Sequence, residues 1–172
     1  MEIRNIRQED LEAVVALEKV NFSEDEQISE SVLENYIQLL FSTCLVMENE
    51  GELAGFILAC PSEVDTVTDA IFFLEASAAP VGKHLAIASL SVAPNYQGQG
   101  VGTLLLAGLK EVAVQRNYQG IALTCKESLI KYYQLNQFED KGPSQSQFGG
   151  KAWYDMYWKA RYKGNFLHFL GL

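Results

Sequence analysis

The chain has 172 residues, of which 48% are hydrophobic, and it carries a formal net charge of −9. This length suits one domain with a full core, and this apolar content excludes disorder as a class. The acidic balance argues against nucleic-acid binding, which depends on cationic contacts to phosphate. No apolar run approaches the roughly 20 residues that span a bilayer, so we expect no membrane segment.

Cysteine usage and the N-terminus bear on the compartment. The chain has an odd number of cysteines, Cys44, Cys60 and Cys125, and each lies in an apolar run. This pattern predicts buried free thiols in a reducing environment. Residues 1–6 lack the apolar segment of a signal peptide, so a cytoplasmic location is expected. Two distant histidines and three scattered cysteines show no metal-ligand spacing, so no metal is expected.

Hydrophobic periodicity predicts alternating groups of strands and helices along the chain. Strands are expected at residues 2–6, 43–47, 53–60, 70–75, 84–92, 120–125 and 152–158. Helices are expected at residues 8–20, 32–40, 101–112 and 128–135. The polar turn around Gly51 is a hairpin signal. The order predicts an α/β fold with a mixed sheet, without internal repeats or an interdomain linker.

One domain is therefore expected over residues 1–160, followed by a C-terminal tail over residues 161–172. The tail is apolar enough to dock either on the body of the protein or on a second subunit, so a homodimer is one of two expectations.

The most informative segment joins the strand that ends at Val92 to the helix that begins at Val101. Gly98, Gly100 and Gly102 occupy alternate positions between them. A glycine-rich turn before a helix exposes backbone N–H groups at the positive end of the helix dipole. Such a turn binds phosphate esters without needing a basic side chain.

Other phosphate-binding motifs fit this segment poorly. The dinucleotide fingerprint needs the order G-x-G-x-x-G, and a Walker A loop needs Gly-Lys-Ser/Thr, but no lysine follows these glycines. A turn without a ligand would leave the three glycines and the helix start together unexplained.

The order Gln97-x-x-Gly100-x-Gly102 resembles the Q/R-x-x-G-x-G/A signature of the GNAT superfamily of acetyl-CoA-dependent N-acetyltransferases. The resemblance implies a GNAT-type fold, in which a mixed, mostly antiparallel central sheet is flanked by helices, and it implies acetyl-CoA as co-substrate. It also implies that one strand pairs through its backbone with the pantetheine arm and that the turn holds the pyrophosphate. The implied cofactor-binding residues are Leu90, Ser91, Val92, Gln97, Gly98, Gln99, Gly100, Val101, Gly102 and Thr103.

A second segment resembles the later F-Y-x-x-x-G-F motif of the same family. Tyr132 and Tyr133 occupy the Phe-Tyr positions, and Phe138 occupies the closing Phe. Gln137 replaces the expected glycine. If the backbone there needs a positive φ, Asn136 is the better candidate to adopt it.

The resemblance places the general acid at Tyr133. A phenol with a pKa near 10 is protonated at neutral pH and can donate a proton to the departing thiolate. Ordinary packing is the alternative role for this side chain. Cys125 is expected to be a core thiol rather than an acetyl-accepting nucleophile, because no histidine lies near it in the sequence.

The identity of the general base stays open between three candidates. The closest resemblance is to arylalkylamine N-acetyltransferases, such as serotonin N-acetyltransferase, whose two strand histidines are replaced here by Ala86 and Ala88. His84 lies earlier on the same predicted strand face and is one candidate. Glu75, at the end of the preceding predicted strand, is a second, and a proton relayed by solvent is the third.

The expected activity is direct acetyl transfer, through a ternary complex, to a small amine that is cationic or carries an arylalkyl group. Aromatic candidates for the acceptor pocket are Phe22, Tyr36, Phe148, Trp153 and Tyr154. Glu24, Asp25 and Glu26 are candidates to attract an ammonium group, while Lys126, Lys131 or Arg116 would meet the adenosine phosphates. The alternatives are a protein or peptide N-acetyltransferase and a non-catalytic CoA-binding module, with a nucleotide-binding regulator as a weaker one.

Overall fold

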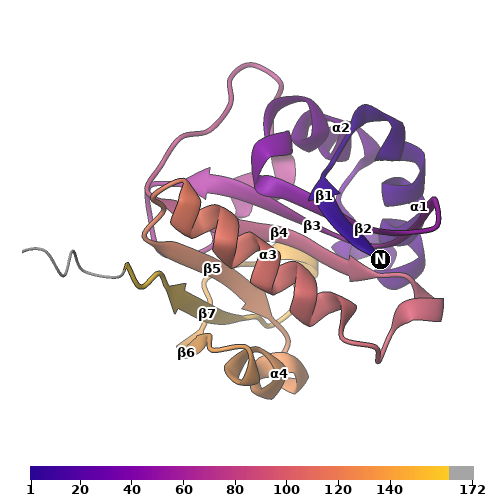
Figure 1. The fold of residues 1–172 in the computed structure, drawn as a ribbon. Helices are drawn as coiled ribbons and strands as arrows, with labels where there is room; N and C mark the ends of the chain where they lie inside the picture. Colours follow the sequence, from indigo (N-terminus) through magenta and orange to yellow (C-terminus); the bar gives the residue numbers. More distant parts are fainter. Residues whose placement is uncertain (163–172) are drawn as a thin grey trace, which may run out of the picture.

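The computed structural model describes residues 1–162, so residues 163–172 of the predicted tail lie outside the described part. One seven-stranded sheet with the order β1-β2-β3-β4-β5-β7-β6 forms the centre of the fold (Figure 1). Its strands are β1 (Glu2–Asn5), β2 (Cys44–Asn49), β3 (Glu52–Ser62), β4 (His84–Val92), β5 (Gly120–Cys125), β6 (Glu139–Pro143) and β7 (Tyr154–Lys159). The helices are α1 (Leu11–Asn21), α2 (Glu30–Leu39), α3 (Val101–Gln115) and α4 (Ile130–Leu135).

All neighbouring strands are antiparallel except β4 and β5, which run parallel. The predicted mixed, mostly antiparallel sheet and the β2–β3 hairpin are therefore confirmed. A single parallel pair needs a crossover connection, and α3 provides it between β4 and β5. In Figure 1 this helix runs across one face of the sheet.

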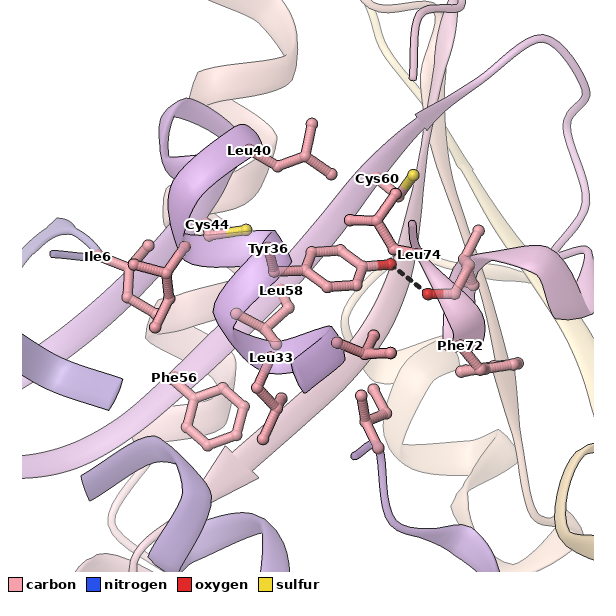
Figure 2. Close-up of a cluster of buried hydrophobic side chains, with 14 of the residues drawn as sticks. Ile6, Leu33, Tyr36, Leu40, Cys44, Phe56, Leu58, Cys60, Phe72 and Leu74 are labelled. Atoms are coloured by element: carbon pink, nitrogen blue, oxygen red, sulfur yellow. Dashed lines mark hydrogen bonds between the residues drawn. The ribbon is translucent and has the colours of Figure 1, made fainter. Parts of the chain in front are cut away.

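Each face of the sheet has its own hydrophobic core. The α1–α2 face packs around Tyr36, which is fully buried and donates a hydrogen bond from its hydroxyl to the Ile71 carbonyl at 2.6 Å. Figure 2 shows this contact among the surrounding apolar side chains, including Cys44 and Cys60. The opposite face packs α3 and α4 against the sheet, with Leu105, Leu106 and Leu109 fully buried. No helix in the described residues is long and apolar enough to cross a membrane.

The strand expected at residues 70–75 is wrong. Residues Asp69–Phe73 form a 3-10 helix, η4, in which Ile71 and Phe72 are buried while Phe73 is 64% exposed. A short apolar run fits a strand or a helical turn equally well by periodicity alone. Here the Ile71 carbonyl bonds to the Tyr36 hydroxyl rather than to a strand. Strand β6 was not predicted, because its sequence, Glu-Asp-Lys-Gly-Pro, contains no apolar alternation. In the structure its residues are exposed apart from the half-buried Gly142.

The expectation that Asn136 takes the positive φ is also wrong. Gln137 has φ +69°, whereas Asn136 has φ −91°. The Phe138 N–H donates to the Tyr133 carbonyl at 3.0 Å, and the Gln137 N–H donates to the Gln134 carbonyl at 2.9 Å. This pair of bonds is a Schellman motif, which requires the left-handed conformation at the position that Gln137 occupies. Asn136 stays at the helix cap, where its side-chain amide donates to the Tyr132 carbonyl.

Replacing Gln137 with glycine should therefore stabilise the protein. A non-glycine residue in the left-handed region costs about 1–2 kcal/mol. Glycine removes this cost, but it loses more conformational entropy on folding, which offsets roughly half of the gain in stability. We expect Gln137→Gly to raise the free energy of unfolding by about 0.5–1 kcal/mol in urea titrations. Asn136→Gly is the matched control and should lower it, because φ there is negative and a side-chain hydrogen bond is lost. Destabilisation by both substitutions would contradict this account of the helix end.

Candidate functional site

The site begins where β4 and β5 separate. The two strands pair only at Leu85 with Ile121 and at Ala86 with Ala122. A bulge in β4 follows at once, because Ile87 pairs with Ala59 and Ser89 with Leu58, which leaves Ala88 without a partner in β3. The remainder of β4 therefore runs beside a gap instead of a neighbouring strand.

The backbone of Leu90 and Val92 faces this gap. The Ala93 N–H donates to the Ala54 carbonyl of β3 at 2.8 Å. Successive residues of a strand direct their peptide groups to opposite sides, so those of Leu90 and Val92 point away from β3. This places the N–H groups of both residues and the Leu90 carbonyl where an extended ligand can hydrogen-bond as a further strand, and the expected role of the two residues in cofactor binding stays a prediction.

The Val92 carbonyl is held by two side chains in the described structure. Asn21 Nδ2 donates to it at 2.9 Å and Gln97 Nε2 donates to it at 3.1 Å. Asn21 also donates to Ser91 Oγ at 2.6 Å, so the Ser91 side chain lies on the α1 face of the sheet rather than in the gap. These bonds join α1, the end of β4 and the glycine turn.

The glycine turn has the backbone that its sequence predicts. Gly98 and Gly100 have φ of +75° and +82°, and a Cβ at either position would meet no atom within 4 Å. The first turn of α3 follows, and its leading N–H groups have no partner within the helix. Open space, left-handed glycines and free amides together suit a pyrophosphate.

The other predicted residues of the turn occupy distinct places. Val101 is buried in the α3 core, and Gln99 Nε2 donates to the Asn95 carbonyl. A Cβ at Gly102 would lie 2.8 Å from the Tyr132 hydroxyl, which is also 3.3 Å from Thr103 Oγ1. Tyr132 therefore lies at the N-terminus of α3, at the turn itself.

A cavity of about 270 Å³ opens from the gap toward the α1–α2 face. Its walls on the gap side come from β4, β5 and α4, and its opposite walls come from α1 and three short segments. The lining residues that carry polar or aromatic groups are Glu18, Asn21, Phe22, Glu26, Phe72, Ser89, Thr124, Lys126, Tyr133, Phe148 and Trp153.

Tyr133 reaches this cavity from α4 and is 9% exposed. Its ring packs edge-on against Tyr132 and Phe138 at centroid distances of 5.1 and 5.9 Å. Burial raises the pKa of the phenol well above its usual range, so the hydroxyl stays protonated at any physiological pH.

Glu18 was not predicted, yet it is the most buried carboxylate in the cavity at 2% exposure. The Ile28 N–H donates to its Oε1 at 3.0 Å, and the Ser89 hydroxyl donates to its Oε2 at 2.9 Å. Burial raises the pKa of this carboxyl, and the two hydrogen bonds offset part of that rise. Ser89 lies directly after the bulge, so Glu18 is fixed beside the strand edge that faces the gap.

Glu26 is the second buried carboxylate of the cavity. It lies in the short 3-10 helix η2 (Glu24–Glu26), and its side chain is 5% exposed. Lys126 Nζ lies 3.0 Å from its Oε1 and donates to Oε2 at 3.2 Å. Lys126, a candidate for the adenosine phosphates, thus lies in the cavity wall and is paired with Glu26.

The segment before β7 forms an aromatic wall. Phe148 stacks on Phe72 with ring centroids 4.1 Å apart, and Trp153 Nε1 donates to the Phe148 carbonyl at 2.8 Å. Asp69 accepts hydrogen bonds from the Ser146 hydroxyl at 2.5 Å and from the Gln147 N–H at 3.1 Å. This anchoring holds the segment over the cavity.

Several predicted residues are not brought to the cavity. His84 lies at the far end of β4, where its Nδ1 is 2.8 Å from the Tyr157 hydroxyl. Glu75 is exposed in the segment after η4 and does not end a strand. Glu24 and Asp25 are exposed, and Tyr36 and Tyr154 pack in the two cores. Within residues 1–162, no group of histidine, cysteine and acidic side chains is placed to hold a metal ion.

Comparison with known proteins accords with this geometry. The model of the acetyltransferase (GNAT) family matches residues 3–137, which is most of the chain. The chain belongs to the GNAT family. It is therefore an acetyltransferase that uses acetyl-CoA as its co-substrate. No curated protein sequence gives a significant match.

Solved structures share this GNAT fold at low sequence identity. The loading GNATL domain of CurA from Lyngbya majuscula has a TM-score of 0.76 at 16% identity, covering 92% of this chain and 97% of that one. The GphF GNAT-like decarboxylase in complex with isobutyryl-CoA has a TM-score of 0.76 at 17% identity, covering 94% and 100%. Ribosomal-protein-alanine N-acetyltransferase from Brucella melitensis has a TM-score of 0.67 at 23% identity, covering 92% and 99%.

Cys125 lines the cavity, so its expected lack of reactivity toward acetyl-CoA can be tested. Burial raises the pKa of its thiol to about 11. At pH 8 about one molecule in a thousand then carries the thiolate that nucleophilic attack needs. We expect intact-mass spectrometry after incubation with acetyl-CoA alone to show no acetyl adduct on the protein. An adduct that Cys125→Ala removes would establish a ping-pong route and contradict this assignment.

Proposed function

We propose that this GNAT protein transfers the acetyl group directly to the amino group of a small cationic or arylalkyl amine. The observation that carries the proposal is the buried carboxylate of Glu18, held next to Ser89 in an aromatic-walled cavity that opens onto the β4–β5 gap. A carboxylate attracts an ammonium group, and aromatic faces favour both cations and aryl rings.

The reaction needs a neutral amine and a protonated leaving group. The amine nitrogen forms a bond to the thioester carbonyl carbon, and the bond from that carbon to sulfur breaks. Glu18, directly or through water, is the proposed acceptor for the proton that the amine loses. Its raised pKa makes it a better base than an exposed glutamate. Tyr133 is the proposed donor of a proton to the departing thiolate.

This assignment of the base replaces the three expectations from sequence. His84 is engaged by Tyr157 outside the cavity, and Glu75 is exposed in a loop. A solvent relay remains part of the proposal, as the route by which Glu18 returns its proton.

A protein or peptide acceptor is the rival within the same enzyme class, and the fold is shared with ribosomal-protein N-acetyltransferases. The anchoring of Ser146 and Gln147 on Asp69 favours a small acceptor, because it fixes the segment whose aromatic side chains, Phe148 and Trp153, form one wall of the cavity. A thiol-release assay with acetyl-CoA over amines and peptides separates the two. Turnover of peptides alone would reject the small-amine proposal, and tight cofactor binding without any turnover would favour a non-catalytic module.

The glycine turn offers a test that is independent of the acceptor. Gly100→Asp should weaken acetyl-CoA binding by about a hundredfold or more, because a carboxylate in this open space repels the phosphates at short range. Gly100→Asn is the matched control. It has nearly the same shape and the same left-handed strain without the charge, and should bind within about tenfold of wild type. Titration calorimetry measures the acetyl-CoA affinity of both variants. Equal affinities would show that the pyrophosphate does not bind at this turn.

Tyr133→Phe removes the proposed donor and keeps the ring. The kcat should fall by on the order of 10²–10⁴, with acetyl-CoA affinity nearly unchanged. Because burial raises the pKa of this phenol, it should cause no alkaline loss of kcat below about pH 10. Tyr132→Phe is the control, since Tyr132 lies at the glycine turn, and its kcat should stay within about threefold of wild type. Near-normal turnover by both variants would show that water protonates the thiolate.

A further inference from the structure

Glu26 has a feature that the proposed reaction does not use. Its side chain is almost fully buried in the cavity wall, and the partner of its Oε1 in the described structure is an ammonium group rather than a backbone or neutral side-chain donor. The ammonium of Lys126, 3.0 Å away, is the cation that compensates it. A buried carboxylate oxygen with unused hydrogen-bonding capacity is costly unless a donor reaches it. In this cavity it becomes available to a donor on a ligand when the Lys126 ammonium moves away.

The two partners of this ion pair differ in how firmly they are held. A Cβ at Gly149, whose φ is +64°, would lie 3.0 Å from Glu26 Cγ and 2.8 Å from the Asp25 carbonyl oxygen. The Glu26 side chain is therefore packed tightly against the backbone of this segment. The side chain of Lys126 is 49% exposed and has a long flexible stem. Rotation of this stem lets the ammonium move into solvent when another cation takes its place, whereas the carboxylate is fixed.

The neighbouring carboxylate lacks a cation of its own. Among residues 1–162, Glu18 forms hydrogen bonds with Ile28 and Ser89 but no salt bridge. Ile28 follows Glu26 by only two residues, which places the two carboxylates on neighbouring parts of one wall. With both ionised, the cavity contains two negative groups and one replaceable positive group.

We propose that the acceptor is a short diamine, and that Glu26 is its specificity-determining residue. This inference rests on the proposed function. One amino group reacts beside Glu18 and Ser89 after losing its proton. The second stays protonated, replaces Lys126 at Glu26 and donates to Oε1. Lys126 occupies the subsite when no acceptor is bound, and its exposed ammonium then moves into solvent.

Paired amines of equal length test this directly. In wild type, KM for diaminobutane should be lower than KM for butylamine by about tenfold, the effect of one charge-assisted hydrogen bond. Glu26→Gln should abolish that difference by raising KM for the diamine alone. Lys126→Met should lower KM for the diamine by about threefold relative to KM for butylamine in the same variant, because the competing cation is removed.

Glu24→Gln is the matched control, since Glu24 lies in the same 3-10 helix but is exposed outside the cavity. It should leave both amines unchanged. An equal effect of Glu26→Gln on the two amines would reveal a purely structural role for this residue. No preference for the diamine in wild type would also overturn the proposal.

A binding measurement separates this inference from the proposed function. Calorimetry of diaminobutane against the protein saturated with CoA requires no turnover. Binding to wild type that Glu26→Gln weakens by about tenfold supports the subsite even if no amine is acetylated, in which case only the proposed activity fails. Equal binding to both proteins, or no binding to wild type, would reject the diamine subsite.

Discussion

The separation of β4 from β5 after Ala86 and Ala122 is the constraint on which the rest of the site depends. A strand in the middle of a sheet normally satisfies its peptide groups on both sides, and unpaired ones are costly when buried. The bulge at Ala88 and the divergence of β5 leave Leu90 and Val92 without that second partner. A ligand that pairs as a strand would satisfy the N–H groups and the Leu90 carbonyl, which is the use that we propose for the gap.

The two cores support opposite sides of this gap. The α3–α4 core fixes Tyr133 and the start of α3, while the α1–α2 core fixes Glu18 and the aromatic wall. The proposed proton donor and the proposed proton acceptor thus come from different faces of one sheet. Burial raises the pKa of both groups, and hydrogen bonds from Ile28 and Ser89 offset part of that rise at Glu18. In the proposed reaction, the protonated phenol donates to the departing thiolate, and the carboxylate of raised pKa accepts the proton of the attacking amine.

Sequence reasoning located the parts of the site that depend on local backbone. The glycine turn and the crossover helix follow from spacing within short segments, and the family resemblance pointed to Tyr133 and to a mostly antiparallel sheet. Glu18 was missed because a glutamate on an amphipathic helix is normally solvated. Its burial arises from contacts with Ser89 and Ile28, which no local pattern reveals. The bulge at Ala88, the conformation of residues 70–75 and the placement of His84 outside the cavity likewise depend on tertiary pairing.

The most direct test of the account is hydrogen exchange at the backbone amides of Leu90 and Val92, followed by NMR with and without acetyl-CoA. Both N–H groups face the gap, whereas the Ser91 N–H points toward β3 and serves as an internal reference. The account predicts that saturating acetyl-CoA slows exchange at Leu90 and Val92 by about tenfold or more relative to Ser91. Unchanged exchange at these two amides in the saturated complex would contradict the claim that the open edge of β4 holds the cofactor.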